Sequence, residues 1–221
     1  MPLVKQRIEK VRDIRGKSKR EGTKKLAKKP MLFGEIRQPK SEYILVPGVS
    51  SERRDYIPIG FVSPKVIASN ATLVIPNATL YHFGILTSSV HMAWMRVVCG
   101  RLRTDYRYSN KIVYNNFPWV EATDAQKETI ATLAQAVLDA RAQFPNSSLA
   151  DLYDPLTMPK ELLKAHQNLD RAVMKLYKFK SGMSESDIVA KLMEMYQKLT
   201  APPTFIPEEK PKQKRKRRNK M

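Results

Sequence analysis

Residues 43–83 read YILVPGVSSERRDYIPIGFVSPKVIASNATLVIPNATLYHF, and this stretch decides the fold. Short runs rich in β-branched and aromatic residues alternate with Pro–Gly, Ser–Pro, Ser–Asn and Pro–Asn pairs, which favour turns. The runs are Tyr43–Val46, Tyr56–Val62, Val66–Ala68, Thr72–Ile75 and Thr79–Phe83. Short strands separated by tight turns predict a small, twisted, mainly antiparallel sheet.

Helical patterns flank this stretch on both sides. Upstream, four apolar residues from Val4 to Ile14 recur at helical spacing among basic residues, which predicts an amphipathic basic helix ending near Gly16. Downstream, Thr87 to about Gly100 is predicted as one helix with an apolar face. That face comprises Val90, Ala93, Trp94, Val97 and Val98. The following segments, Arg101–Asn110 and Lys111–Tyr114, are predicted as extended chain that returns to the sheet.

The chain after Glu121 has an all-helical pattern. Thr123 and Gln126 match a capping box, and Pro159 stands at the start of a second helix. Ser184 with Asp187 opens a third, and three amphipathic helices with short connections predict a small bundle. The predicted fold class is therefore α+β. Its expected parts are a sheet-and-helix domain over 1–121 with a basic linker helix over 1–30, a helical domain over 122–200, and a disordered basic tail over 201–221.

The charge balance predicts a polyanionic partner. The chain carries 40 Lys and Arg against 21 Asp and Glu, a formal net charge of +19. Residues 1–30 hold 12 basic and 3 acidic residues, and residues 208–221 hold 8 and 2. Because no apolar stretch approaches the ~20 residues of a membrane span, nucleic acid is favoured over a membrane. The single cysteine, Cys99, is predicted to be a buried structural thiol, and its isolation, with no secretory signal, predicts a cytoplasmic protein.

Catalytic motifs are hard to find in this sequence. Its eight glycines are scattered and form no cofactor-binding turn. Asn115–Trp119 departs from the motif that grips a flipped adenine, because it has one proline where two are expected, so we predict a turn with buried aromatic rings. The three histidines lack metal-ligand spacing, and His166, on an apolar stripe, is predicted to be a core histidine. The chain is therefore expected not to be catalytic alone, although whether it forms part of an enzyme stays open.

A row of charged residues has the composition of a base-reading surface. Arg101, Arg103, Asp105 and Arg107 alternate with other residues, so in an extended strand all four would face one side. Arginine pairs with guanine and aspartate accepts from cytosine in the major groove. The alternative is a solvated strand face in which Asp105 pairs with an arginine. Arg53, Arg54 and Lys65 are candidate contacts to the DNA backbone, or else members of a surface ion cluster.

Longer motifs carry a resemblance to a known family. SSERR at 50–54, FGILTS at 83–88, DYRYS at 105–109, YNNFPW at 114–119 and LADLYDP at 149–155 resemble the C-terminal third of MmeI-like, type IIL restriction–modification enzymes. The resemblance implies a target-recognition domain up to about Glu121, followed by a helical domain. It also implies base-reading positions at Asn70, Ala71, Arg103, Asp105 and Arg107, whereas Arg101 joins the candidate backbone contacts.

The resemblance also defines the expected partners. It implies a recognition module for double-stranded DNA that positions a catalytic domain absent from this chain. S-adenosylmethionine is then expected only in that missing methyltransferase domain, with no cofactor here, and a separate methyltransferase or endonuclease chain is a further candidate partner. Two alternatives remain open: a residual or split adenine-specific DNA methyltransferase subunit, and a basic RNA-binding protein.

Overall fold

The computed structural model describes residues 1–35 and 37–201, so all but the first residue of the predicted tail lies outside the described residues. The described chain combines helices with two small antiparallel sheets, which confirms the predicted α+β class. The strands are β1 (Tyr43–Pro47), β2 (Val49–Ser50), β3 (Gly60–Val62), β4 (Thr72–Pro76), β5 (Gly100–Leu102) and β6 (Asp105–Arg107). The helices are α1 (Pro2–Gly16), α2 (Glu21–Leu26), α3 (Leu80–Leu86), α4 (Ser89–Val98), α5 (Asp124–Ala142), α6 (Leu149–Leu152), α7 (Lys160–Leu176) and α8 (Glu185–Thr200), with a π-helical turn η1 (Asn110–Tyr114).

The predicted sheet is divided into two. One sheet has the order β3-β1-β4 and the other the order β2-β6-β5, with every neighbouring pair antiparallel. The chain passes from the first sheet to the second at Gly48, between β1 and β2. The sequence pattern therefore predicted antiparallel pairing correctly, but it predicted one sheet where the structure has two.

Three of the predicted strand segments are wrong. Val66–Ala68 lies in the connection between β3 and β4, and Lys111–Tyr114 belongs to η1. Thr79–Phe83 enters α3 instead, because the His82 ring, 2.9 Å from the Thr79 hydroxyl, accepts a hydrogen bond from the Thr79 amide and caps the helix. Capping competes successfully here with the β propensity of the run.

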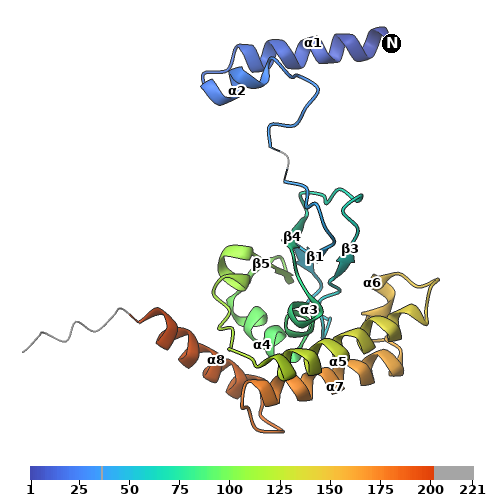
Figure 1. Cartoon of the computed structure of the whole chain (residues 1–221), viewed down its shortest axis with the longest axis vertical. Helices are drawn as coiled ribbons and strands as arrows, with labels where there is room; N and C mark the ends of the chain where they lie inside the picture. Colours follow the sequence, from blue (N-terminus) through green and yellow to red (C-terminus); the bar gives the residue numbers. More distant parts are fainter. Residues whose placement is uncertain (36, 202–221) are drawn as a thin grey trace, which may run out of the picture.

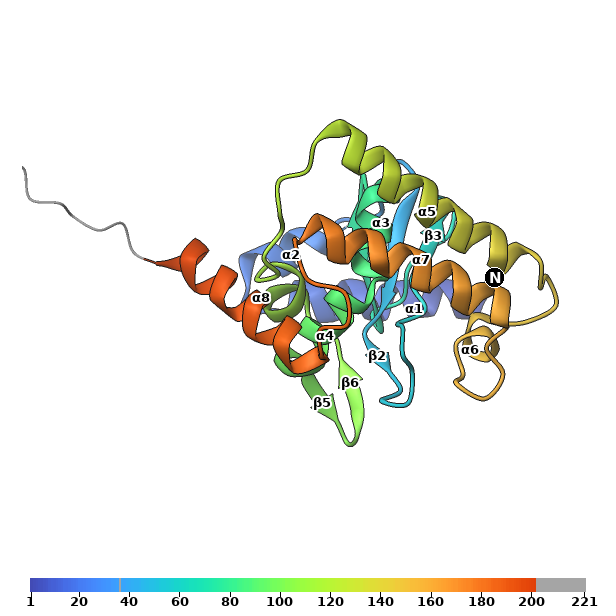
Figure 2. The ribbon, with the colours of Figure 1, turned by 90° about the horizontal axis from the view of Figure 1, so that it is seen from below.

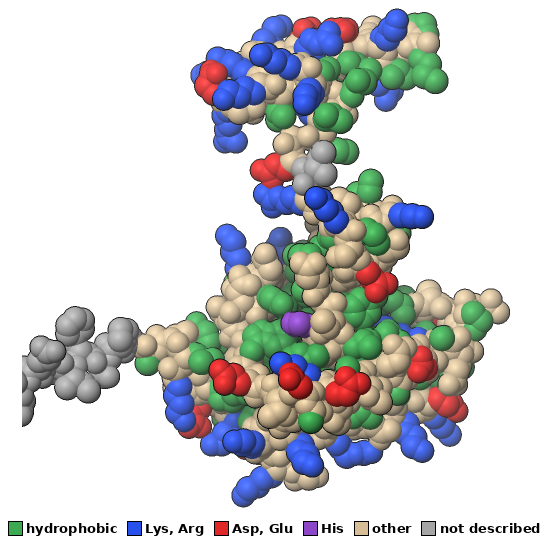
Figure 3. Space-filling view, in the orientation of Figure 1, with side chains coloured by type: hydrophobic (Ala, Val, Ile, Leu, Met, Phe, Trp, Pro, Cys, Tyr) green, Lys and Arg blue, Asp and Glu red, His purple; other side chains and the backbone are tan. Residues whose placement is uncertain are grey.

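The helices on either side follow their sequence patterns more closely. The predicted basic helix is α1, which contacts α2 and has no buried residue. Lys and Arg side chains crowd the surface of these two helices, which lie apart from the sheets (Figures 1 and 3). The helix predicted from Thr87 to Gly100 is α4, although Val97 is exposed instead of facing the core.

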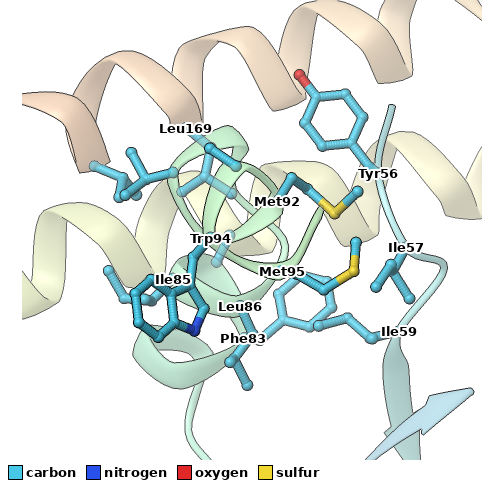
Figure 4. Packing of buried hydrophobic residues seen from close by; sticks show 14 of the residues in the cluster. Tyr56, Ile57, Ile59, Phe83, Ile85, Leu86, Met92, Trp94, Met95 and Leu169 are labelled. Carbon is cyan, nitrogen blue, oxygen red and sulfur yellow. The ribbon is translucent and has the colours of Figure 1, made fainter. Parts of the chain in front are cut away.

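The helices after residue 121 do not form a bundle of their own. α5 packs along both α3 and α7, whereas α8 lies mainly against α4, with the rings of Trp94 and Tyr196 5.8 Å apart (Figures 1 and 2). One core thus joins the sheets to the C-terminal helices. Figure 4 shows part of it: Phe83, Ile85 and Leu86 from α3, Met92, Trp94 and Met95 from α4, Tyr56, Ile57 and Ile59 before β3, and Leu169 from α7.

Candidate nucleic-acid interface

The charged row from Arg101 to Arg107 folds as a hairpin, not as one strand. β5 and β6 pair antiparallel, and Arg103 with Thr104 forms the turn, where Arg103 adopts a positive φ of 57°. The prediction of four charged residues on one strand face is therefore wrong. Residues opposite each other in a hairpin share a face. Arg101 lies opposite Tyr106, which places it on the other face from Asp105 and Arg107.

The hairpin presents its charges in different ways. Arg103 and Arg107 are exposed, whereas Asp105 is half-buried. The guanidinium of Arg101 lies 4.2 Å from the centre of the Tyr106 ring and donates to the Thr104 carbonyl over 2.9 Å, so the hairpin itself orients this side chain. Within residues 1–35 and 37–201, no ion pair joins Asp105 to an arginine. The alternative of a solvated face in which Asp105 pairs with an arginine therefore does not describe this hairpin.

Gly48 brings the second predicted base-reading segment beside the hairpin. Its amide donates to the carbonyl oxygen of Ala71 over 2.9 Å, and its own carbonyl accepts from the amide of Tyr108 over 3.0 Å. A Cβ at Gly48 would lie 2.7 Å from the Ala71 oxygen, so only glycine permits this approach. Asn70 and Ala71 are both exposed. The structure therefore places the two predicted base-reading segments on either side of one glycine.

The candidate backbone contacts separate into two places. The loop after β2 carries Arg53 and Arg54 and projects in the same direction as the β5–β6 hairpin (Figure 2). Arg53 is exposed, and Arg54 is half-buried. Lys65 is exposed but lies near the start of β1, because the hydroxyl of Tyr43, the first residue of β1, donates to the carbonyl of the adjacent Val66 over 2.7 Å. Lys65 thus lies at the opposite end of β1 from Gly48.

The same arginines and lysine form no ion cluster with the part of the chain that the structure describes. Among the described residues, none of Arg53, Arg54 and Lys65 takes part in an ion pair. The Nε of Arg54 is buried and finds no hydrogen-bond acceptor in the described part of the chain. Arg53 is thus exposed and without an ion-pair partner among the described residues, whereas part of the Arg54 guanidinium is buried.

A buried histidine supports the base of the hairpin, and sequence reasoning missed it. The Nε2 of His91 lies 2.9 Å from the Tyr108 hydroxyl, and its ring packs edge-on against Phe117. Full burial lowers the pKa of His91 to about 3. Tyr108 thus joins the hairpin to Gly48 through its amide and to α4 through its hydroxyl. No local pattern signals this contact, and the apolar face predicted for this helix did not include His91.

The residues considered for catalysis and metal binding are structural or dispersed. His166 is fully buried, as predicted, with its Nε2 2.6 Å from the Tyr153 hydroxyl. Phe117 is buried, but Trp119 is only half-buried. Cys99 is also half-buried instead of buried, and this burial raises the pKa of its thiol. In the described residues, no three His, Cys, Asp or Glu side chains gather as a metal site. None of the helices described here has the length and apolar character needed to cross a membrane.

Two family models match this chain. A family model described as the MmeI target recognition domain matches residues 1–121, and one described as the MmeI C-terminal domain matches residues 122–202. The chain belongs to the MmeI family. The resemblance predicted from the motifs is thus confirmed, and the shared core shows that the two MmeI regions pack against each other in this chain.

Two relatives of known description are larger than this chain. DNA methyltransferase A of Bacillus subtilis (strain 168) is 41% identical over 199 residues, which are 90% of this chain and 22% of that protein. A solved structure of the type IIL restriction-modification enzyme MmeI in complex with DNA is 51% identical, with a TM-score of 0.82 over 91% of this chain and 27% of that one. This MmeI-family chain therefore spans about a quarter of the length of each.

Proposed function

We propose that this chain reads a short sequence in double-stranded DNA and positions a catalytic domain that acts there. The observation that carries the proposal is the junction at Gly48, which holds Asn70–Ala71 beside the β5–β6 hairpin. Both segments are exposed in large part, and the hairpin projects in the same direction as the Arg53–Arg54 loop (Figure 2). Family membership and the DNA bound to the solved relative support the same conclusion.

The hairpin is the proposed reading element. The major groove of B-DNA is about 12 Å wide and admits a two-stranded ribbon such as β5–β6. Asp105 and Arg107 share one face, where arginine would pair with the O6 and N7 of guanine and aspartate would accept from the N4 of cytosine. Arg103, at the turn, would reach furthest into the groove. Each such contact discriminates against a wrong base by about 1–3 kcal/mol.

The remaining cations supply affinity without sequence information. Arg101 lies on the opposite hairpin face and is held by Tyr106 and the Thr104 carbonyl, which suits a fixed contact to a phosphate. Arg53 and Arg54 would contact the backbone from the neighbouring loop. Lys65 stands apart from this group, and its contribution would require DNA that extends past the start of β1.

Catalysis is assigned to a domain outside this chain. We place the binding of S-adenosylmethionine in that domain, whether it is supplied by a separate methyltransferase or endonuclease chain or by more sequence of the same protein, and we place the system in the cytoplasm. The described residues would contribute position only, by holding the catalytic domain at a fixed distance from the sequence that is read.

Titration of fluorescent duplex and RNA pools tests the proposal. We expect tighter binding to duplex DNA, and an affinity that falls with salt by about 0.9 log units per log unit for each phosphate contacted. Arg107→Ala should weaken binding, whereas Lys127→Ala, which removes a cation from α5 on the far side from the hairpin in Figure 2, should not. Preference for RNA would favour an RNA-binding protein. Calorimetric binding of S-adenosylmethionine to this chain would favour a methyltransferase subunit instead.

A further inference from the structure

The loop that carries Arg53 and Arg54 is anchored by the C-terminal helices. The loop leaves β2 after Ser50 and enters β3 at Gly60. Residues 51–54 are partly exposed, and the hydrogen bonds within them are short-range, such as the amide of Arg54 donating to the Ser51 carbonyl over 3.2 Å. Directly after the arginines, three positions are held by polar groups of distant elements. These positions are Asp55, Tyr56 and Ile59.

The strongest of these anchors is Asp170 of α7. The Tyr56 hydroxyl donates to one carboxylate oxygen over 2.6 Å, and the amide of Ser89, at the start of α4, donates to the other over 2.7 Å. Burial raises the pKa of Asp170, and both hydrogen bonds oppose that shift. Because a buried carboxylate is costly without such donors, Tyr56 is held to one position by the group that it satisfies.

Arg141 of α5 provides the second anchor. Its Nη1 donates to the Ile59 carbonyl over 2.7 Å, and its Nε donates to the Tyr153 hydroxyl over 2.8 Å. That hydroxyl lies 2.6 Å from the Nε2 of His166, whose ring stacks on Tyr56 with centres 4.1 Å apart. The second anchor therefore meets the first at the Tyr56 ring, where stacking on His166 joins the two sets of hydrogen bonds.

The third anchor passes through α4 to α8. Arg96 donates to the carbonyl of Asp55 over 3.0 Å and forms an ion pair with Glu185 over 2.6 Å. The Arg96 side chain is 21% exposed and that of Glu185 51%, so solvent weakens this pair more than the buried contacts. All three anchors begin within one to six residues of the arginines and end on α5, α7 or α8.

We propose that the C-terminal helices position Arg53 and Arg54 against the DNA backbone, with Asp170 and Arg141 as the main positioning residues. The inference rests on the proposed DNA-binding function and extends it to helices that carry none of the proposed DNA contacts. Arginine side chains lose much rotational freedom when they bind a phosphate, so a loop that is already fixed binds more tightly than a mobile one.

The test uses the full chain with Tyr56→Phe, which removes one hydroxyl and keeps the ring that stacks on His166. We expect duplex affinity to fall on the order of tenfold. The slope of log affinity against log salt should fall by the amount that corresponds to about one to two phosphate contacts. Tyr196→Phe is the matched control, because the Tyr196 ring, in α8, packs on Trp94 of α4 and belongs to none of the three anchors. Asp170→Asn should act in the same direction, and circular dichroism would establish that it folds.

A double-mutant cycle separates positioning from a general loss of stability. In a chain that carries Arg53→Ala and Arg54→Ala, Tyr56→Phe should no longer change the affinity or the salt slope. An equal loss in both backgrounds would overturn the inference, as would an unchanged salt slope for Tyr56→Phe. If the unaltered chain binds duplex DNA without any salt dependence, the proposed function itself fails, so the two failures are distinguishable.

Discussion

The amide of Gly48 donates a 2.9 Å hydrogen bond to the carbonyl oxygen of Ala71, and this contact joins two exposed segments that lie far apart in the sequence. The Gly48 carbonyl accepts from Tyr108 at the base of the β5–β6 hairpin, so one residue fixes the spacing between Asn70–Ala71 and the hairpin. Base reading depends on such spacing, because a displacement of about 1 Å is enough to lose well-directed hydrogen bonds.

Gly48→Ala should therefore impair recognition more than folding. The added Cβ would lie 2.7 Å from the Ala71 oxygen, a backbone atom that cannot rotate away, and relief would move Asn70–Ala71 from the hairpin. We expect a loss of stability of about 1–3 kcal/mol in urea denaturation and a weaker preference for the selected duplex. Gly100→Ala is the control, since its Cβ would meet nothing closer than 3.9 Å. An equal effect of both substitutions would contradict the role given to Gly48.

Replacement of Arg107 and replacement of Arg101 should have different effects on DNA binding. Arg107→Ala is expected to relax base preference at one position by about 1–3 kcal/mol. Arg101→Ala, on the other hairpin face, should weaken binding equally for all sequences and lower the salt slope by about one. Competition titrations with single-base variants of a selected duplex would measure both effects. The assignment of the hairpin faces is wrong if Arg101→Ala changes preference and Arg107→Ala does not.

The contact between α3 and α5 depends on Gly84. A Cβ there would lie 2.6 Å from the Cγ2 of Ile130 and 3.3 Å from the Cβ of Ala134. Gly84→Ala should thus destabilise the chain by about 1–3 kcal/mol through overpacking, and Ile130→Ala in the same chain should recover part of this loss. Gly22→Ala, with nothing within 4 Å of its Cβ in α2, should leave stability unchanged or slightly raised. Thermal and urea unfolding would compare the variants.

Acid should destabilise the fold through His91 and His166. Burial lowers the pKa of each to about 3, with Arg141 adding to the effect at His166, whereas an unfolded chain protonates its histidines near 6.5. Between these values the unfolded state binds more protons than the folded state. The free energy of unfolding should therefore decrease by about 1.4 kcal/mol per histidine for each pH unit of acidification. Asp170 opposes this, because its raised pKa lets the folded state bind a proton first.

Nuclear magnetic resonance would test the histidine assignment directly. The imidazole signals of His91 and His166 should not titrate between pH 7 and pH 5 while the protein stays folded. Urea denaturation over the same range should show a falling free energy of unfolding. Midpoints near 6.5 for either buried ring would show that it is accessible to protons in the folded state.

Local capping chemistry could be predicted from sequence, because both partners lie within one helical turn. The backbone amide of Gln126 donates to the Thr123 hydroxyl over 3.3 Å, and Ser184 with Asp187 caps α8 as expected. The turn at Arg103 could not, since charged and uncharged residues alternate in this sequence whether it forms one strand or a hairpin, although the turn moves Arg101 to the other face. A positive φ at an arginine, without glycine or asparagine nearby in the turn, leaves no sequence signal.

The contacts that anchor the Arg53–Arg54 loop could not be predicted from the sequence for a different reason. Tyr56 and Asp170 are 114 residues apart, and nothing in a local pattern links a tyrosine in a loop with an aspartate on an amphipathic helix. Arg103, Asp105 and Arg107 were predicted from the charged row and from the family resemblance, Asn70 and Ala71 came from the resemblance alone, and all five remain proposals. Their division between two segments that meet at Gly48 is visible only in the fold.

Selection from a pool of randomised duplexes tests the central claim most directly. The chain is mixed with the pool, and bound duplexes are recovered and sequenced over several rounds. We predict enrichment of one short asymmetric sequence, and replacement of Arg103, Asp105 and Arg107 by alanine should abolish that enrichment while leaving salt-dependent binding in place. Recovery of duplexes without any shared sequence, by a chain that binds DNA well, would contradict the account.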